Sequence, residues 1–404
     1  MGSLISFLLL TLAGLFTIPV IVFCIEILAA MTLPQREFLL SLRNVERRRI
    51  AVLVPAHNES NGMLGTLDDI KAQLYSGDRL LVVADNCTDD TATVAKVAGA
   101  EVTERHDLAR IGKGYALDWG LRHLSVDPPE IVIVIDADCR LATNTLDQLA
   151  TACAAARRPT QSLYLMTAPD ESPINYRVAM FAFRVKNWVR PLGLRALHLP
   201  CQLMGTGMAF PWEIISSAEL ATGAAVEDIK LGLDLTRAGN PPLFCPSARL
   251  SSQFPSSIGG TETQRKRWEQ GHIGIIVRTV PRLVYESLSH RNFGLLALTL
   301  DIAVPPLTLL GMLVSLMLAV SVFGALFGLS SAALLISAAS FSGYLLAVVL
   351  CWLKFGRDIL PLSSIWSVAS YVVGKLPLYR RILSRGSRSQ WIRTDRKKVG
   401  KDSR

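Results

Sequence analysis

The sequence predicts an α/β domain with a mostly parallel sheet, flanked on its N-terminal and C-terminal sides by transmembrane helices. In the middle of the chain, short runs of β-branched residues alternate with segments of helical composition, an alternation typical of parallel sheets. Of the 404 residues, 50% are hydrophobic, and the mean hydropathy of +0.35 is high for a soluble protein. The longest uncharged stretches lie towards the two ends of the chain, so we expect the membrane segments there.

The first apolar stretch, residues 3–25, contains no charged side chain. It is longer than the roughly 20 residues that a helix needs to cross a bilayer. Because it lacks the basic start and the small-residue cleavage site of a secretory signal, we expect an uncleaved N-terminal anchor over residues 1–30. Five arginines follow within residues 36–49. By the positive-inside rule they predict that the next segment lies on the cytoplasmic side of the inner (plasma) membrane, in a multi-pass protein.

Two further apolar stretches, residues 302–327 and 332–353, predict two more spans joined by a short Gly-Leu-Ser-Ser turn. A third stretch, residues 359–374, is shorter and contains Pro361. We expect it to lie in the membrane interface or to re-enter the bilayer, because an even number of crossings then keeps the basic tail inside; a third span of this region is the alternative. Together these segments predict a C-terminal membrane region over residues 293–375.

The positive charge of the chain fits this membrane topology. The formal net charge is +9 at pH 7, and the C-terminal tail, residues 376–404, is rich in Lys and Arg. A basic tail suits the anionic cytoplasmic leaflet, so we expect a cytoplasmic tail and a lipid bilayer as a partner. No RNA-binding or DNA-binding motif accompanies the charge, and we expect no nucleic-acid partner.

The central strand of the predicted sheet, residues 131–135, consists of five β-branched residues and is followed by Asp136 and Asp138. Such a run is typical of a strand buried on both faces, and ligands bind at the carboxyl edge of parallel sheets. If the strand continues through the two carboxylates, its two-residue period points both the same way. Their oxygens then suit a hard cation such as Mg²⁺ or Mn²⁺. Alternatively, the pair solvates a loop or caps a helix.

The first strand of the domain, residues 50–55, ends at Pro55 and is followed by His57, Asn58 and Glu59. A dinucleotide-binding protein would carry its glycine fingerprint here, and a P-loop protein would carry Gly-Lys-Ser or Gly-Lys-Thr; neither sequence occurs. These polar residues are instead candidates for ligand binding at the sheet edge. A helix cap is the alternative role for Asn58.

A predicted helix over about residues 63–73 leads to the second strand, residues 80–84, which ends at Asp85. We expect Asp85 to bind ligand at the same edge as the first strand's polar residues. The two aspartates at 89–90 suit the positive N-terminus of the following helix, residues 93–98, and are assigned to structure.

A short third strand at residues 100–104 precedes a helix that opens at residues 110–114. Two glycines flank Lys113 there, an arrangement that suits an anionic diphosphate at a helix N-terminus. A plain basic turn has the same composition. These elements complete the alternation that predicts the parallel sheet.

After the central strand, residues 161–168 predict another strand, and residues 180–199 predict an amphipathic helix, at the membrane surface or packed in a core. The Gly-Thr-Gly sequence at 205–207 allows a close backbone approach or forms an ordinary turn. Asp228 precedes a predicted helix over residues 229–238. It is either a helix cap or the base that deprotonates an attacking hydroxyl.

A last group of polar residues, Gln264, Arg267 and Trp268, lies in a predicted helix ahead of the second membrane span. An arginine suits phosphate, and a tryptophan offers a stacking platform for a sugar ring.

In their order and separation, these motifs resemble the membrane-integrated members of glycosyltransferase family 2, which are related to cellulose, chitin, hyaluronan and poly-N-acetylglucosamine synthases. The resemblance covers about residues 50–278 and extends to the flanking membrane segments. It implies a cytoplasmic, GT-A-type, nucleotide-sugar-binding domain over residues 48–280.

The resemblance also implies roles for individual residues. The donor-binding residues are expected to be Pro55, His57, Asn58, Glu59, Asp85, Lys113 and Asp136. Asp136 and Asp138 match the Asp-x-Asp element that holds the divalent cation, Mg²⁺ or Mn²⁺, bridging the diphosphate. Asp228 matches the acidic residue after Glu in the family's Thr-Glu-Asp motif, the proposed base. The family's Gln-x-x-Arg-Trp motif, which contacts the departing diphosphate and the acceptor sugar, matches Gln264, Arg267 and Trp268.

The implied function is that of an inverting, metal-dependent hexosyltransferase that uses a nucleotide-sugar, with a UDP-sugar as the expected donor. The expected acceptor is a saccharide or a lipid-linked molecule at the cytoplasmic membrane face, in exopolysaccharide or glycolipid biosynthesis. The alternative is a catalytically inactive relative that serves as a scaffold among the partner proteins of a polysaccharide assembly complex. Retention of the acidic and Arg-Trp motifs argues against that alternative.

Two departures from the family pattern bear on the acceptor. Val226 stands where the Thr-Glu-Asp motif has its threonine, and no gating-loop motif of the Phe-x-Val-Thr type follows Trp268. About three spans are also few for a polymer channel. These features favour addition of one sugar to a lipid-linked acceptor, as in ceramide glucosyltransferases, which carry a related element.

Overall fold

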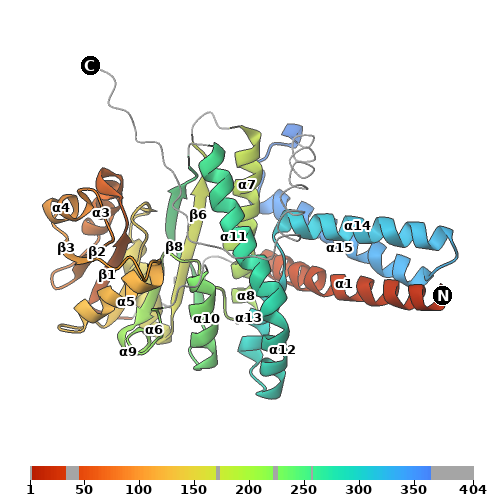
Figure 1. The fold of residues 1–404 in the computed structure, drawn as a ribbon, viewed down its shortest axis with the longest axis horizontal. Coiled ribbons are helices and arrows are strands. Elements are labelled where there is room, and N and C mark those ends of the chain that lie inside the picture. Colours follow the sequence, from red (N-terminus) through yellow and green to blue (C-terminus); the bar gives the residue numbers. More distant parts are fainter. Residues whose placement is uncertain (1, 33–44, 170–172, 222–225, 256–257, 365–404) are drawn as a thin grey trace. The chain divides into compact units, whose positions relative to one another are not determined.

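The structure is a computed structural model of the 404-residue chain (Figure 1). It describes residues 2–32, 45–169, 173–221, 226–255 and 258–364, except for the side chains of residues 258–267 and 364. The chain divides into two compact units. The sheet unit comprises residues 35–172, 202–271 and 387–404, and the helical unit comprises residues 1–34, 173–201 and 272–386.

The sheet unit is built on one eight-stranded sheet within the described residues. Its strands are β1 (Ile50–Ala56), β2 (Arg79–Asp85), β3 (Glu101–Arg105), β4 (Ile131–Val134), β5 (Arg140–Leu141), β6 (Thr160–Thr167), β7 (Met208–Pro211) and β8 (Leu243–Gln253). They lie in the order β3-β2-β1-β4-β7-β6-β8-β5. The pairs β1–β2, β2–β3, β1–β4 and β6–β8 are parallel, whereas β4–β7, β6–β7 and β5–β8 are antiparallel. The predicted α/β fold with a mostly parallel sheet is confirmed.

The parallel part of the sheet brings the ends of three strands to one edge. All of β4 is buried, as its β-branched sequence predicts for a strand covered on both faces. Ala56, near the end of β1, pairs with Ala84 in β2, and Leu53 pairs with Val134, the last residue of β4. The residues that follow β1, β2 and β4 therefore emerge at the same carboxyl edge.

Helices of the sheet unit connect and cover the strands. They are the 3₁₀ turn η1 (Ser60–Met63) and the helices α3 (Leu64–Lys71), α4 (Thr91–Val97), α5 (Lys113–Leu124), α6 (Thr145–Ala156), α9 (Trp212–Ile215) and α10 (Glu227–Arg237). A further helix, α11 (Ile258–Arg278), contributes residues to both units.

Helix α5 lies directly on the sheet through a glycine. A Cβ atom at Gly120 would lie 2.4 Å from Leu53 Cδ1 and 2.9 Å from Val83 Cγ2. Only a residue without a side chain permits this approach. Because Leu53 and Val83 belong to the buried core of the sheet, the close packing fixes α5, and with it Lys113 at the helix start.

The helical unit contains three helices that are long and apolar enough to cross a membrane, counted over the described residues. They are α1 (Gly2–Thr32), α14 (Leu307–Leu326) and α15 (Ser331–Phe355). The other elements are α7 (Ile174–Arg184), the π-helical turn η2 (Val185–Val189), α8 (Arg190–Ala196), α12 (Val280–Ser289), α13 (Phe293–Ala303) and the 3₁₀ turn η3 (Leu362–Ser364).

The predicted span over residues 302–327 is only partly confirmed. Ile302 belongs to α13, and the long apolar helix begins at Leu307. The break falls at Pro305 and Pro306, where two rings remove backbone donors and disfavour the helical conformation before them. Of the apolar stretch 359–374, only residues 359–364 are described, so its interfacial or spanning position stays a prediction.

The segment predicted as an amphipathic helix over residues 180–199 is a packed part of the helical unit. It consists of α7, the π-helical turn and α8. Phe181 and Val185 are buried, and the ring of Trp188 meets that of Phe355 edge-on at 5.4 Å. The core alternative therefore holds for this segment.

A buried ion cluster joins three helices of this unit. Arg190 Nε donates to Glu26 Oε2 at 2.6 Å, and its Nη2 donates to Asp301 Oδ1 at 2.5 Å. All three side chains are buried, and a buried charge requires such partners. Next to the cluster, a Cβ atom at Gly193 would lie 1.9 Å from the Glu26 carbonyl oxygen, so α8 and α1 meet at their backbones.

Candidate active site

The loops after β1 and β2 are tied to each other at the carboxyl edge. Asn58, whose φ of +55° lies in the left-handed region, accepts a hydrogen bond from the Thr88 amide at 2.7 Å. His57 Nδ1 lies 2.7 Å from the Asp85 carbonyl oxygen. The Asn58 side chain thus holds the neighbouring loop, whereas the cap position of the next helical turn is Glu59, without a side-chain cap. The alternative role of Asn58 as a cap of that turn is wrong.

Asp85 is the last residue of β2, and its carboxylate forms an ion pair with Arg105. Arg105 Nη1 donates to Asp85 Oδ1 at 2.6 Å, and both side chains are buried. The second amino group of the guanidinium donates to the Arg110 carbonyl oxygen at 2.7 Å. Sequence reasoning did not single out Arg105, although the end of the neighbouring strand β3 is the place from which a cation reaches Asp85.

The acidic pair after β4 lies in a turn. The strand ends at Val134, and the Cys139 amide donates to the Asp136 carbonyl oxygen at 3.2 Å. The strand therefore does not continue through Asp136 and Asp138, and the two-residue period does not orient their side chains. The Asp136 amide donates to Thr206 Oγ1 at 3.0 Å, which fixes the start of the turn.

A threonine of α3, Thr66, also holds this turn through hydrogen bonds. Thr66 Oγ1 lies 2.8 Å from the Ala137 carbonyl oxygen and 2.7 Å from that of Cys139. Thr66 is buried, so this hydroxyl satisfies backbone oxygens that water does not reach. The positions of the two carboxylates thus depend on residues in three separate parts of the sequence.

Lys113, at the start of α5, is the cation that bonds to the acidic turn. Its ammonium group donates to Asp136 Oδ1 and to the Gly205 carbonyl oxygen, the latter at 2.8 Å. Burial alone would lower the pKa of Lys113, but the charges of Asp136 and Glu227 outweigh it and raise the pKa above its ordinary value. The lysine is therefore charged at neutral pH.

Gly205 keeps the space between Lys113 and Asp228 open. Its φ is +83°, in the left-handed region that favours glycine. A Cβ atom there would lie 3.6 Å from Asp228 Oδ2 and 3.8 Å from Lys113 Nζ. Two residues on, a Cβ atom at Gly207 would lie 1.8 Å from Ser162 Oγ, so the Gly-Thr-Gly sequence does make a close backbone approach.

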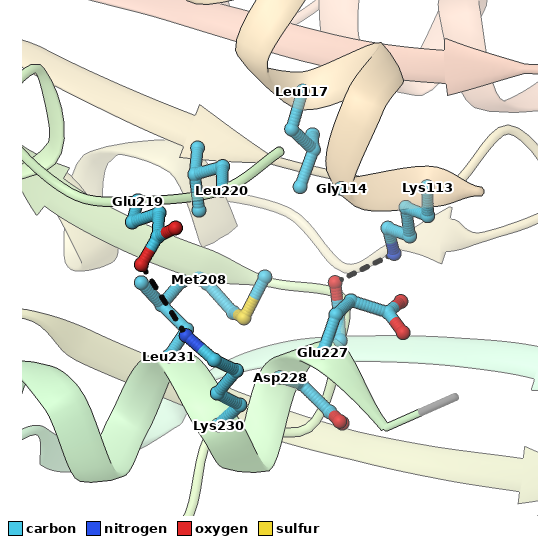
Figure 2. Close-up of a pocket in the computed structure, with 11 residues that line it drawn as sticks. Lys113, Gly114, Leu117, Met208, Glu219, Leu220, Glu227, Asp228, Lys230 and Leu231 are labelled. Carbon is cyan, nitrogen blue, oxygen red and sulfur yellow. Dashed lines mark hydrogen bonds and ion pairs between the residues drawn. The ribbon is translucent and has the colours of Figure 1, made fainter. Parts of the chain in front are cut away.

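These residues form one wall of a pocket whose other wall is α10 (Figure 2). Figure 2 shows Lys113 on one side and Glu227 and Asp228, in the first turn of α10, on the other. Leu117 and Leu231 contribute apolar surface. The pocket lies at the start of two helices, where the backbone dipoles favour negative charge.

The two acidic residues in the first turn of α10, Glu227 and Asp228, have different surroundings. Burial raises the pKa of Glu227, and the charge of Asp228 raises it further, while Lys113 opposes both effects. The sequence analysis assigned no role to Glu227, although its position directly before Asp228 is a signal that could have identified it. Asp228 Oδ1 accepts a hydrogen bond from the Ile229 amide at 2.9 Å, so the carboxylate stabilises the helix start, where Val226 is the cap residue.

Helix α11 passes the same acidic pair. A Cβ atom at Gly271 would lie 2.8 Å from Val226 Cγ1, so the helix backbone packs against the residue that precedes Glu227. Gln264, Arg267 and Trp268 belong to this helix. The side chains of Gln264 and Arg267 lie outside the described residues, and the contacts predicted for them stay predictions.

The acidic turn fits a divalent cation that takes most of its ligands from a substrate. Across the described residues, no group of three His, Cys, Asp or Glu side chains is arranged to hold a metal ion alone. Magnesium in phosphate-transferring sites is commonly held by one or two carboxylates together with substrate phosphates. Asp136 and Asp138 are two such carboxylates, which agrees with a cation that binds together with a diphosphate.

The sheet, with its acidic turn at the carboxyl edge, has the GT-A-type fold of enzymes that act on nucleotide-sugars. The chain resembles the solved structure of the mannosyltransferase PcManGT from Pyrobaculum calidifontis with a TM-score of 0.52 and 16% identity. The likeness covers 93% of this chain and 99% of the other, which was solved with GDP-Man and Mn²⁺. At this identity the likeness shows the fold alone.

Residues 47–271, more than half of the chain, match the family model described as glycosyltransferase like family 2. The chain belongs to this family, which confirms the family predicted from the sequence. It is 26% identical over 264 residues to the probable glycosyltransferase YdaM of Bacillus subtilis, covering 58% of this chain and 57% of YdaM.

A second relative is the uncharacterized glycosyltransferase Mb0553 of Mycobacterium bovis. It is 39% identical over 100 residues, which cover 25% of this chain and 41% of the relative. The chain therefore spans less than two thirds of the length of either relative.

Proposed function

We propose that this glycosyltransferase is an inverting, metal-dependent hexosyltransferase that moves a sugar from a nucleotide-sugar to an acceptor at the cytoplasmic face of a membrane. The observation that carries the proposal is the pocket in which Lys113, bonded to Asp136, faces Glu227 and Asp228. A cation for the diphosphate and a carboxylate for the acceptor hydroxyl lie on opposite walls of one space.

The nucleotide end of the donor is assigned to the linked loops after β1 and β2. Asp85 and Asn58 present oxygen acceptors there, held in place by Arg105 and by the Thr88 amide. Such acceptors suit the donor groups of a base or ribose. A UDP-sugar is the donor we expect from the family resemblance. The GDP-Man found in PcManGT makes a guanosine donor the second one to test.

The divalent cation is assigned to Asp136 and Asp138. When bound, such an ion neutralises charge on the departing nucleoside diphosphate. Lys113 lies beside Asp136 and is charged, so it supplies a further positive group for the same phosphates. Arg267 is the third cation that we assign to the diphosphate, from the family motif.

The chemical step needs a base on the acceptor side, and we assign that role to Asp228. Its carboxylate takes the proton from the acceptor hydroxyl while the oxygen forms a bond to the anomeric carbon. The bond between that carbon and the diphosphate oxygen breaks, and the electron pair leaves with the nucleoside diphosphate. Because this is one displacement, an α-linked donor gives a β-linked product.

The helical unit supports our assignment of the acceptor. Its three long apolar helices favour an acceptor that resides in the bilayer, such as a lipid-linked one, and a saccharide is the alternative. We place the enzyme in the inner membrane, with Asp228 on the cytoplasmic side, in exopolysaccharide or glycolipid biosynthesis.

The experiment uses the purified full chain in nanodiscs with a panel of UDP- and GDP-sugars, Mg²⁺ or Mn²⁺, and membrane lipid extract. Metal-dependent release of nucleoside diphosphate that rises with lipid supports the proposal, and the product's size separates one added sugar from a polymer. A folded protein that releases nucleoside diphosphate from no donor overturns it and favours the scaffold role.

A matched pair of variants tests the base. Asp228→Asn is expected to abolish transfer while donor binding persists. Asp234→Asn, on the same helix, changes a residue that pairs with Lys230 and Arg237 outside the acidic pair, and we expect transfer to continue. Full transfer by Asp228→Asn with donor binding intact rules out Asp228 as the base.

A further inference from the structure

The two oxygens of the Asp85 carboxylate have different surroundings. Arg105 Nη1 donates to Oδ1 at 2.6 Å, and Asn86 Nδ2 donates to the same oxygen at 3.1 Å. A carboxylate oxygen accepts about two hydrogen bonds, so these two donors saturate Oδ1. Among the residues that the structure describes, none donates to Oδ2. The carboxylate therefore offers a ligand one acceptor oxygen rather than two.

The two donors are themselves held in place by further hydrogen bonds. Arg105 Nη2 donates to the Arg110 carbonyl oxygen at 2.7 Å and lies 3.3 Å from Asp107 Oδ2. The side chain of Asn86 accepts from the Asp107 amide at 2.7 Å and donates to the Asp107 carbonyl oxygen at 3.3 Å. Both Arg105 and Asn86 are buried. Because neither donor can turn away without losing these bonds, the Asp85 carboxylate is held in one orientation.

A single acceptor oxygen distinguishes the nucleobases by their hydrogen-bonding edges. Uracil presents one donor, N3–H, between two carbonyl oxygens. Guanine presents two adjacent donors, N1–H and its amino group, which together pair with both oxygens of a carboxylate. Cytosine presents a lone pair at N3, which a carboxylate oxygen repels. Because Oδ1 is saturated, guanine would leave one donor unpaired at Asp85, and an unpaired polar group in a closed site lowers affinity.

We propose that Arg105 and Asn86 are positioning residues that make the donor site selective for uracil. They occupy Oδ1 of Asp85 and leave Oδ2 as the acceptor for N3–H of the base. The orientation of one carboxylate thereby selects a UDP-sugar over a GDP-sugar or a CDP-sugar. The inference rests on the assignment of Asp85 to the nucleotide within the proposed function, but not on the acceptor or on the base that deprotonates it.

The first measurement is the binding of nucleoside diphosphates to the full chain in nanodiscs with Mn²⁺. Calorimetric titrations with UDP, GDP and CDP give three dissociation constants without any sugar transfer. We expect UDP to bind at least about tenfold more tightly than either of the other two, because each of them leaves a polar group of the base unpaired.

The variant Asp85→Asn changes the free position from an acceptor to a donor and preserves the size of the side chain. Arg105 and Asn86 both require an acceptor, so the amide oxygen takes the place of Oδ1 and the amide nitrogen faces the base. Asp107 remains beside Arg105 as a counter-charge. A donor at this place pairs with cytosine N3, and we therefore expect CDP to bind more tightly than UDP.

The comparison of UDP with CDP separates hydrogen bonding from fit. Uracil and cytosine have rings of the same size, so a reversal between them cannot arise from the space in the site. We expect the ratio of the UDP and CDP dissociation constants to change about 100-fold between the unsubstituted chain and Asp85→Asn. Asp127→Asn is the control, because Asp127 is an exposed carboxylate that pairs with Arg49, and all three constants should stay as in the unsubstituted chain.

Arg105→Met added to Asp85→Asn tests whether Arg105 sets the orientation. The double variant removes both charges of the pair together, which a buried ion pair tolerates better than the loss of one partner. Without the guanidinium, the amide can turn either of its groups towards the base, and we expect the preference for CDP to fall to about twofold or less. If Arg105 only supported the fold, both affinities would fall and their ratio would stay the same.

Several results would overturn the inference. Binding of GDP as tight as that of UDP in the unsubstituted chain means that the carboxylate does not select the base. A preference for UDP that persists in Asp85→Asn, or a ratio that ignores Arg105→Met, means that Arg105 does not fix the orientation of residue 85. A chain that is folded by circular dichroism and binds none of the three nucleotides removes the nucleotide site itself. That last result overturns the proposed function as well, whereas the others leave it intact.

Discussion

Lys113 joins Asp136 to the backbone of Gly205. Its ammonium group donates to the Asp136 carboxylate and to the Gly205 carbonyl oxygen, the latter at 2.8 Å. Glu227 and Asp228 also act on its charge from the other side of the pocket. One cation therefore links the turn assigned to the metal with the helix start assigned to the base, and its removal affects both.

The first prediction concerns Lys113→Met. Without the ammonium group, the diphosphate loses a cation, and we expect the affinity for nucleoside diphosphate to fall about 10- to 100-fold, or about 1.4 to 2.7 kcal/mol. Binding of Mn²⁺ alone is expected to tighten, because Asp136 no longer has a competing positive partner. Calorimetric titrations with Mn²⁺ and with nucleoside diphosphate, run separately, measure both effects.

Lys96→Met is the matched control for this variant. Lys96 is an exposed lysine that pairs with Glu104, so both titrations should match those of the unsubstituted chain. Unchanged affinities in Lys113→Met would remove the lysine from the site.

The second prediction concerns Gly205→Ala. The added methyl group would lie in the gap between Asp228 and Lys113, at 3.6 Å and 3.8 Å from their reactive atoms. We expect kcat to fall at least tenfold, with a loss of roughly 1 kcal/mol in the free energy of unfolding from the left-handed backbone. Steady-state kinetics and chemical denaturation measure the two effects.

Gly239→Ala separates strain from obstruction. Gly239 has a φ of +82°, and a Cβ atom there would meet nothing within 4 Å. Both variants carry the same backbone strain, but only one fills the pocket. Equal loss of kcat in the two variants would show that the space beside Asp228 is not used.

The edge of the sheet was predictable because each hydrophobic strand stops at a polar residue. β2 ends at Asp85, and Asp136 follows the end of β4, as the sequence indicates. The partners of these carboxylates were not predictable. Arg105 reaches Asp85 because of the register of β2 with β3, and Lys113 reaches Gly205 across 92 residues of sequence. Such pairings depend on how the strands and helices pack, which the local pattern does not contain.

Two expectations differ from the structure for different reasons. Asp136 and Asp138 point the same way if the strand continues through them, but hydrogen bonds with Thr66 and Thr206 hold a turn there instead. The span predicted over residues 302–327 begins later, at Leu307, because Pro305 and Pro306 interrupt the helix, and both prolines are visible in the sequence. The turn at the acidic pair could be found only from the structure, whereas the break before Leu307 could have been predicted from the two prolines.

The third prediction concerns the contact between α11 and α10. Gly271→Ala would place a methyl group 2.8 Å from Val226 Cγ1, closer than two carbons approach in folded proteins. We expect α11 to shift relative to Glu227 and Asp228 and kcat to fall. Val226→Ala in the same chain removes the obstructing methyl groups and is expected to restore most of the activity.

A double-mutant cycle tests whether the effects of substituting Gly271 and Val226 depend on each other. Kinetics of Gly271→Ala, Val226→Ala and the double variant give the coupling between the two positions, which we expect to be about 1 kcal/mol or more for direct contact. Additive effects would show that Gly271 and Val226 do not act on each other, and they would contradict the expected shift of α11.

The fourth prediction concerns the pH dependence of the reaction. Burial, and then the charge of Asp228, raise the pKa of Glu227 above that of an ordinary glutamate, about 4.3. On acidification Glu227 therefore gains a proton earlier, and the field around Lys113 changes while ordinary surface carboxylates stay charged.

Because the folded state binds this proton more tightly than the unfolded chain, protonation stabilises the fold, and that contribution is lost as pH rises through the raised pKa. We expect the wild-type kcat to fall on the acid side without unfolding, at a pH higher than an ordinary glutamate would give, and we expect this ionisation to be missing from the profile of Glu227→Gln. Parallel measurements of kcat and of circular dichroism against pH test this, and an identical acid limb in both proteins would assign the ionisation to another group.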